Sequence, residues 1–179
     1  MQRFLVLSDT HSPRFHLPGD LSPLMAGVEG IIHCGDFSDY AAFLELDAYG
    51  LPVYGVAGNN DDWELRRILP ERRILLLGDL KVALTHGAGF GGTAHACARR
   101  EFSRQKADLI LFGHSHLPEA HDSLSPPAYN PGSFSQGRGM GNTLGILEIE
   151  GGNHLFRHFL VNSKTGDIIW EIFPGRKEE

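Results

Sequence analysis

Two histidines separated by one residue, His114 and His116, stand in the short sequence Gly-His-Ser-His and have the chemistry of a metal chelate. Uncharged imidazole is the commonest metal ligand among side chains. The apolar run at residues 108–112 predicts a buried strand directly before the pair. Alternate side chains of an extended chain point the same way, so both rings would face one cavity. Two ordinary surface histidines are the alternative, because so short a motif arises often by chance.

Two more predicted strands end in residues that bind metals. Asp9 and His11 repeat the same spacing after the apolar run 3–7, and Asp36 follows the run 31–34. In open α/β sheets, ligands bind just past the carboxyl ends of the strands, which is where these residues would lie. A carboxylate has two oxygens with which to bridge two cations. A polar turn for the first pair and a helix N-cap for Asp36 are the alternatives.

Asn59 and His86 occupy the same position after two other predicted strands. Asn59 follows the strand 53–57, and His86 follows 81–85, which forms a predicted hairpin with 74–77. An amide oxygen is a neutral hard ligand that suits a site with carboxylates, although Asn is also common in turns. Five strand ends therefore carry groups that can bind metals, and independent chance explains all five poorly.

Other polar residues have plainer explanations. Asp61, three residues before Glu64, resembles a capping box that opens a helix at 62–69. Further histidines are expected to be ordinary core or surface residues: His33, His95, His121, His154 and His158.

The elements that must position these residues predict an α/β domain. Further helices are expected at 22–29, with Gly30 as its cap, and at 40–49 and 93–106. Interleaved strands and helices in the first half imply mostly parallel pairing. A polar strand at 119–123 and turns at 125–127 and 130–133 follow the histidine pair. Strands at 143–149, 154–161 and 167–173 form an antiparallel meander, which we expect to be a second sheet packed against the first.

Composition limits the partners and the compartment. The chain of 179 residues, 41% of them hydrophobic, suits one globular domain over 1–179. Its apolar runs are too short to span a bilayer and no signal-peptide core is recognisable, so we expect a cytoplasmic protein that makes no membrane contact. Cys34 and Cys97 are expected to be buried free thiols. A net charge of −6 disfavours sequence-specific nucleic-acid binding.

The ordered set of motifs resembles the signature of the calcineurin-like metallophosphoesterase superfamily. The matching pieces are Asp9-Thr10-His11, Gly35-Asp36, Gly58-Asn59-Asn60-Asp61, His86 and Gly113-His114-Ser115-His116. The resemblance spans residues 4–138, and the small size and Asn130-Pro131-Gly132-Ser133 are most similar to the compact bacterial and archaeal phosphodiesterases of the superfamily. It implies two packed mixed β-sheets flanked by helices, in a four-layer αββα sandwich.

The resemblance also implies a dinuclear metal centre and a role for each ligand. One ion would be held by Asp9, His11 and His116. The other would be held by Asn59, His86 and His114, with Asp36 as the bridge. Imidazole and carboxylate ligands without thiolate suit Mn²⁺, Ni²⁺, Fe²⁺, Co²⁺ or Zn²⁺, and we expect Mn²⁺ first.

The implied reaction is hydrolysis of a small phosphoester, a diester rather than a monoester, by metal-bound hydroxide. Asp36, Asn59 and His86 would be its catalytic residues. Asn60 and Arg138 are expected to bind the substrate; a solvated loop cation is the alternative for Arg138. Many superfamily members carry His at position 60, where it is thought to protonate the leaving group. Asn60 can donate a hydrogen bond but no proton, so the general acid is left unassigned.

A binding module is the rival hypothesis. The compact branch also resembles the retromer subunit, which uses this fold as a protein-interaction scaffold with weak or absent catalysis. The metal motifs of that subunit are degraded, whereas all seven presumptive ligands are present here, which favours the enzyme. The sequence leaves open whether the protein forms a homo-oligomer.

Overall fold

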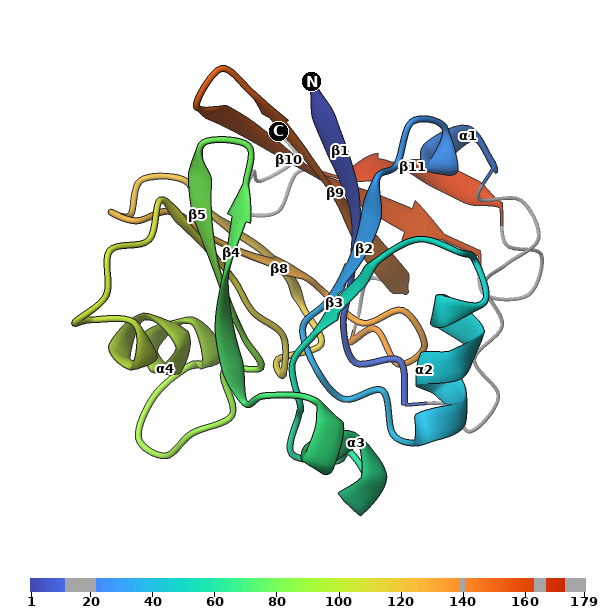
Figure 1. Ribbon diagram of the computed structural model, residues 1–179, viewed down its shortest axis with the longest axis horizontal. Helices are drawn as coiled ribbons and strands as arrows, with labels where there is room; N and C mark the ends of the chain where they lie inside the picture. Colours follow the sequence, from blue (N-terminus) through green and yellow to red (C-terminus); the bar gives the residue numbers. More distant parts are fainter. Residues whose placement is uncertain (12–21, 139–140, 163–166, 173–179) are drawn as a thin grey trace.

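Two mixed β-sheets pack against each other and carry helices on their outer faces (Figure 1). A computed structural model describes residues 1–11, 22–138, 141–162 and 167–172. The architecture confirms the α/β sandwich that the sequence motifs implied.

The first sheet has six strands in the order β11-β10-β9-β1-β2-β3. Its parallel part consists of β1 (Gln2–Leu7), β2 (Gly30–His33) and β3 (Val53–Gly55). The antiparallel part consists of β9 (Asn142–Glu150), β10 (Asn153–Val161) and β11 (Ile168–Ile172). The two parts join where β9 pairs with β1.

The second sheet has five strands in the order β4-β5-β6-β8-β7. The predicted hairpin forms between β4 (Arg72–Leu77) and β5 (Leu80–Thr85). β6 (Leu109–Leu111) and β8 (Ala128–Pro131) run parallel to β5, and β7 (Pro118–His121) closes the edge antiparallel to β8.

The prediction that the C-terminal meander forms the second sheet is wrong. Phe4 of β1 pairs with Leu147 of β9, so the meander extends the first sheet instead. The second sheet begins at the β4-β5 hairpin. It also contains β8, whose last two residues belong to a segment for which the sequence predicted a turn. Its residues pair with Ile110 and Leu111 of β6, a long-range contact that local patterns do not encode.

Both faces of the central strands are buried, because successive side chains alternate between the two sides of a sheet. Phe4 and Val6 of β1 share the apolar cluster between the sheets with residues of β5, including Val82 and Leu84. Leu5 and the other odd-numbered side chains of β1 face outward, where α2 (Tyr40–Asp47) packs. The two-sided burial holds the ends of β1 and β5 at fixed positions.

The helices are shorter than the sequence predicted. α1 (Ser22–Met25) ends before Gly27, whose φ of +71° suits a residue just past a helix end, and Gly30 begins β2 instead of capping a helix. α3 (Trp63–Ile68) ends before Pro70, as expected. α4 (Ala94–Glu101) stops well before the predicted end at residue 106, and turns follow it. It covers the outer face of the second sheet.

Cys34 and Cys97 are buried free thiols, as predicted. Among the described residues, no helix combines the length and the apolar character that crossing a membrane requires.

Asp61 is structural, although the predicted capping role is wrong. The N-cap of α3 is Asp62, whose carboxylate accepts from the Leu65 backbone N–H at 2.9 Å. Asp61 is 5% exposed and accepts from three backbone N–H groups in the loops after β2 and β3. These donors belong to Asp36 (3.2 Å), Ser38 (2.8 Å) and Gly58 (2.7 Å). Asp61 therefore joins the two loops that carry Asp36 and Asn59.

We expect Asp61→Ala to lower the free energy of unfolding by about 2–3 kcal/mol, because three backbone donors, two of them buried, lose their acceptor. Asp62→Ala, the matched change at the cap, should cost about 1 kcal/mol. Urea unfolding of both variants in the presence of a chelator measures the difference without any contribution from bound metal. Equal losses would show that the loops do not depend on Asp61.

Candidate metal centre

The carboxyl ends of strands from both sheets meet at one place. The backbone N–H of His114, after β6, donates to Asp9 Oδ2, after β1, at 2.9 Å. The ring of His86, after β5, reaches the Cys34 carbonyl, after β2, with Nδ1 2.8 Å from the oxygen. The two contacts cross from one sheet to the other, so the fold brings together the strand ends that the sequence singled out.

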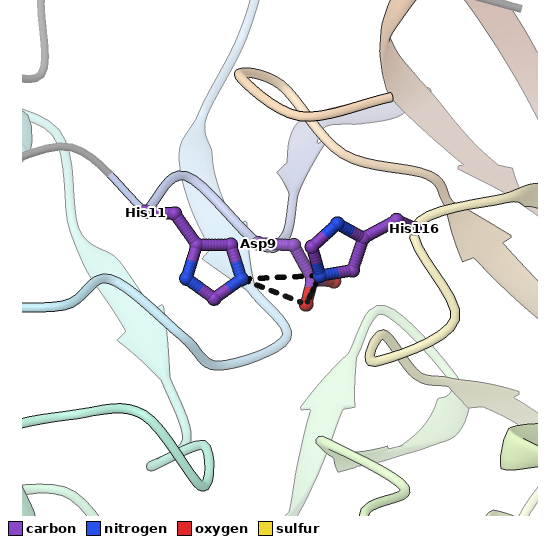
Figure 2. A group of neighbouring side chains, drawn as sticks. All are labelled: Asp9, His11 and His116. Atoms are coloured by element: carbon purple, nitrogen blue, oxygen red, sulfur yellow. Dashed lines mark hydrogen bonds and ion pairs between the residues drawn. The ribbon is translucent and has the colours of Figure 1, made fainter. Parts of the chain in front are cut away.

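Asp9, His11 and His116 form the first group of candidate ligands (Figure 2). The Nε2 atom of His116 lies 3.2 Å from Asp9 Oδ1, and that of His11 lies 3.7 Å from the same oxygen. The two Nε2 atoms are 3.1 Å apart. Ligands about 2.1 Å from one metal ion are separated from each other by roughly these distances. The three side chains therefore have the spacing that a single ion needs.

The two oxygens of Asp9 differ in their surroundings. Oδ2 accepts from Ser8 Oγ at 2.6 Å and from the His114 N–H. Oδ1 is buried and makes no hydrogen bond of normal geometry. A buried carboxylate oxygen without a hydrogen-bond donor is costly unless a positive charge lies beside it. A divalent cation next to Oδ1 would supply that charge, so the donor set fits a metal.

Burial raises the pKa of Asp9, but the imidazoles of His11 and His116 outweigh burial and hold that pKa well below its usual range. The contact with Asp9 in turn raises the pKa of His116, against the effect of partial burial. Carboxylate and protonated imidazole stabilise each other in the absence of metal. Because a ligand must be deprotonated, metal binding would oppose the rise in the pKa of His116.

Asp36 lies between His11 and His86. Its Oδ2 atom is 3.5 Å from Nε2 of His11 and 3.2 Å from Nε2 of His86. Burial raises the pKa of Asp36, but the hydrogen bond and charge of His86 lower it to about 2. The Asn60 N–H and side-chain amide donate to Oδ1 and Oδ2, each at 2.7 Å. The carboxylate is therefore ionised and held in place between two groups of histidines.

His86 and Asn59 lie side by side, with Nε2 of His86 3.1 Å from Asn59 Oδ1. When Nδ1 of His86 donates its proton to the Cys34 carbonyl, Nε2 keeps a lone pair for a cation. Desolvation lowers the pKa of His86, but the contact with Asp36 reverses this and raises it. The ring of His114 is almost perpendicular to that of His86, with 5.1 Å between their centroids. Desolvation lowers the pKa of His114.

The backbone at these residues is left-handed and not extended. Among the described residues other than glycine, six have positive φ, and five of the six are candidate ligands. These five are Asp9 (52°), His11 (39°), Asp36 (58°), His114 (71°) and His116 (60°). The expectation that His114 and His116 share a face because the chain is extended is therefore wrong. The left-handed conformation costs about 1–2 kcal/mol per residue, so it marks a site that the surrounding structure enforces.

Two glycines permit the close approach of the loops. A Cβ on Gly113 would lie 2.0 Å from Ser8 Oγ and 2.9 Å from Asp9 Oδ2. A Cβ on Gly58 would lie 2.1 Å from Asp36 Oδ1. Neither position has room for a larger residue unless a candidate ligand moves.

The remaining predicted residues lie at the rim of the site. The Arg138 N–H donates to the His116 carbonyl at 3.4 Å, and its guanidinium charge opposes the rise in the pKa of His116 that Asp9 causes. Arg138 and Asn60 are exposed, and the polar contacts of Asn60 are with Asp36. Both residues are thus beside the candidate ligands, where the sequence analysis expected them.

A cavity of about 530 Å³ opens beside Asn59 and His86. The charged residues in its lining are Arg66, Glu71, Arg72 and Glu101. Arg66 also donates to the carbonyls of Asn59 and Asp61, so it supports the loop that carries Asn59. Arg66 and Arg72 carry no signal of a site in the sequence, since charged residues on a short helix and a strand look like a solvated surface.

The amino-acid sequence is similar to those of known phosphoesterases. A sequence profile described as the calcineurin-like phosphoesterase superfamily domain matches residues 2–152. A probable metallophosphoesterase of Methanocaldococcus jannaschii is 31% identical over 131 residues, which is 72% of this chain and 66% of that protein. A phosphodiesterase of the same organism is 29% identical over 166 residues, which covers 81% of this chain and 92% of that protein.

Solved structures show the same architecture. Vps29 of Chaetomium thermophilum superposes with a TM-score of 0.78, over 96% of this chain and 95% of that chain. At 16% identity, this likeness concerns the fold alone.

We expect Gly58→Ala to reduce the metal content of the purified protein several-fold, because the new methyl group would displace Asp36. Gly92→Ala is the matched control, since its Cβ would meet Ala96 at an ordinary 3.4 Å. Elemental analysis after dialysis against Mn²⁺, with circular dichroism to confirm the fold, measures the effect. Full occupancy in the Gly58 variant would mean that the position of Asp36 is not needed for binding.

Proposed function

The chain belongs to the calcineurin-like phosphoesterase superfamily, and we propose that it is a phosphodiesterase with a dinuclear metal centre. This family is metal-dependent, and the chain has groups of side chains that can hold metal ions. In the proposal, Asp9, His11 and His116 hold one ion. Asn59, His86 and His114 hold the other, and Asp36 contacts both.

The position of Asp36 carries the proposal. Its Oδ2 atom is within 3.5 Å of Nε2 atoms on two sides, one from His11 in the first group and one from His86 in the second. A carboxylate in that position can hold two cations close together, as an ionised ligand with several lone pairs. Asp61 and Asn60 fix the loop and the carboxylate, so the geometry does not depend on a mobile side chain.

When bound, two divalent ions would lower the pKa of a water nucleophile and stabilise the charge on the entering and leaving oxygens. The residues of this chain would position those ions and the substrate. Asn59 and His86 border the cavity of about 530 Å³, which gives room for one ester group. Arg138 on the rim beside His116 offers a positive charge and hydrogen-bond donors to a phosphate.

Preference for a diester is supported by the phosphodiesterase among the relatives. The cavity beside Asn59 and His86 would receive one of the two ester groups. Arg66 and Arg72, which line the cavity, would attract an anionic substituent, while Glu71 and Glu101 favour hydroxyl or amino groups. We propose Mn²⁺ as the first metal to test and the cytoplasm as the compartment.

Asn60 determines how the leaving group would depart in the proposed reaction. Its amide donates to Asp36, and it has no proton to give to a leaving group. The leaving oxygen would therefore depart as an anion stabilised by metal or solvent. Substrates with acidic leaving groups should react fastest.

A protein-interaction scaffold is the alternative function, favoured only by the fold shared with Vps29. The buried Oδ1 atom of Asp9 supports a metal site, which either function can have, so turnover is what separates the two. Turnover that depends on metal would support the enzyme, and capture of a partner without metal would support the scaffold.

We expect Asp36→Asn to lower kcat/KM for bis(p-nitrophenyl) phosphate by at least about a thousand-fold, because the neutral amide cannot hold two cations. Asp79→Asn, in the exposed β4-β5 turn, makes the same chemical change away from the site and should be neutral. Steady-state kinetics with Mn²⁺, together with elemental analysis, gives both readouts. Unchanged turnover in the Asp36 variant would contradict the two-metal assignment.

The dependence of the rate on the leaving group tests the role of Asn60. For a series of aryl phosphodiesters, log(kcat/KM) should fall steeply as the pKa of the leaving phenol rises, provided that chemistry limits the rate. Asn60→His introduces a group with a near-neutral pKa and should flatten the slope. Asn60→Gln, which supplies no proton either, is the control and should keep the steep slope. If the histidine variant keeps its metals but shows the wild-type slope, position 60 does not face the leaving group.

A further inference from the structure

Three side chains outside the proposed centre have the composition of a metal site. His95 lies on α4, and Glu119 and His121 lie on β7, the edge strand of the second sheet. One possible ligand atom from each lies within 4.8 Å of the others. Their side chains are 30%, 21% and 28% exposed, so solvent reaches them. Both histidines are ordinary core or surface residues by sequence, and the function proposed above does not use them.

The fold brings these residues together. Ala120 of β7 packs against the apolar cluster between the sheets, so its neighbours Glu119 and His121 point to the outer side. α4 covers that outer side, and Ala94, directly before His95, is buried in the cluster beneath the helix. The ring of His121 stacks on Phe112 of the same cluster. Apolar packing therefore anchors the backbone on both sides of the group.

The distances suit a cation with nitrogen and oxygen ligands. Nε2 of His121 is 2.9 Å from Glu119 Oε2, and Nδ1 of His95 is 3.9 Å from the same oxygen. The two imidazole centroids are 4.4 Å apart. Ligands in a tetrahedral zinc site are about 3.3 Å from one another, given bonds of about 2.0–2.1 Å. Small rotations of the side chains would bring all three to that separation.

Hydrogen bonds from neighbouring residues orient two of the three side chains. Ser115 Oγ donates to Glu119 Oε1 at 2.6 Å, which leaves Oε2 facing the histidines. Thr93 is the N-cap residue of α4, yet its hydroxyl makes no capping hydrogen bond and lies 2.9 Å from Nδ1 of His95. The Ser115 contact, which leaves the other carboxylate oxygen free, is of the kind that fixes the orientation of ligands in known metal sites. The Thr93 hydroxyl would have to release Nδ1 if that nitrogen bound the ion.

We infer that His95, Glu119 and His121 form an additional binding site for one Zn²⁺ ion or a divalent ion of similar preference. Two histidines and a glutamate are a zinc ligand set that leaves a fourth position for water. The site is connected to the proposed centre because Ser115, which holds Glu119, lies between His114 and His116. That connection rests on the proposed function, whereas the additional site does not.

The test compares zinc content. Metal-free wild type, His95→Ala, His121→Ala and the double variant are dialysed against the same micromolar Zn²⁺ solution and analysed for zinc per chain. We expect each variant to contain one equivalent less than wild type. His154→Ala is the control, because His154 contacts Tyr129, whose ring lies between the two sheets on the face opposite to the group, and should keep the wild-type content.

Equal zinc content in wild type and in the folded double variant would overturn the inference and leave a simple hydrogen bond between Glu119 and His121. Failure of the proposed function would give a different pattern of zinc content. If the centre around Asp36 held no metal, wild type would still bind one equivalent and the double variant none. The singly substituted proteins, which change partly exposed side chains, keep the comparison available if the double variant does not fold.

Discussion

The site depends on the hydrogen bond from the His114 backbone N–H to the buried carboxylate of Asp9. It joins the end of β1 in one sheet to the end of β6 in the other, and none of the described strands pairs across the two sheets. Because Asp9 is fully buried, its charge must be matched by donors and cations in its immediate surroundings. The Ser8 hydroxyl and the His114 N–H satisfy one oxygen, and the other is left facing His11 and His116. Folding thus places a negatively charged carboxylate oxygen where a metal ion would neutralise it.

The backbone conformation of the loops that carry the candidate ligands is energetically unfavourable by itself. Several of these residues adopt a left-handed backbone, and Gly58 and Gly113 are needed where the loops approach each other. Asp61 and the packed strands beneath the site supply the opposing stability. Such a scaffold holds imidazole and carboxylate groups close together before any ion is present. Because these side chains are already in place, metal binding requires little movement of them. The arrangement also favours one coordination geometry over several.

The sequence allowed the candidate ligands and the strands before them to be predicted, because ligand types recur at strand ends and buried strands are short apolar runs. The reason given for His114 and His116 sharing a cavity was wrong, since φ angles cannot be read from spacing. The joining of β9 to β1 was also missed, because local alternation does not tell which strands pair. Asp61 and Asp62 are adjacent and both can cap, so only the structure distinguishes the loop-joining residue from the cap. His95 and Glu119 are 24 positions apart in the chain, and no motif links them.

The central claim is that Asp36 contacts two metal ions, and anomalous diffraction from crystals soaked in Mn²⁺ tests it most directly. The account predicts two anomalous peaks about 3.5–4 Å apart, on either side of the Asp36 carboxylate. One peak should lie beside Asp9, His11 and His116, and the other beside Asn59, His86 and His114. A single peak at full occupancy, or peaks that do not contact Asp36, would contradict the account.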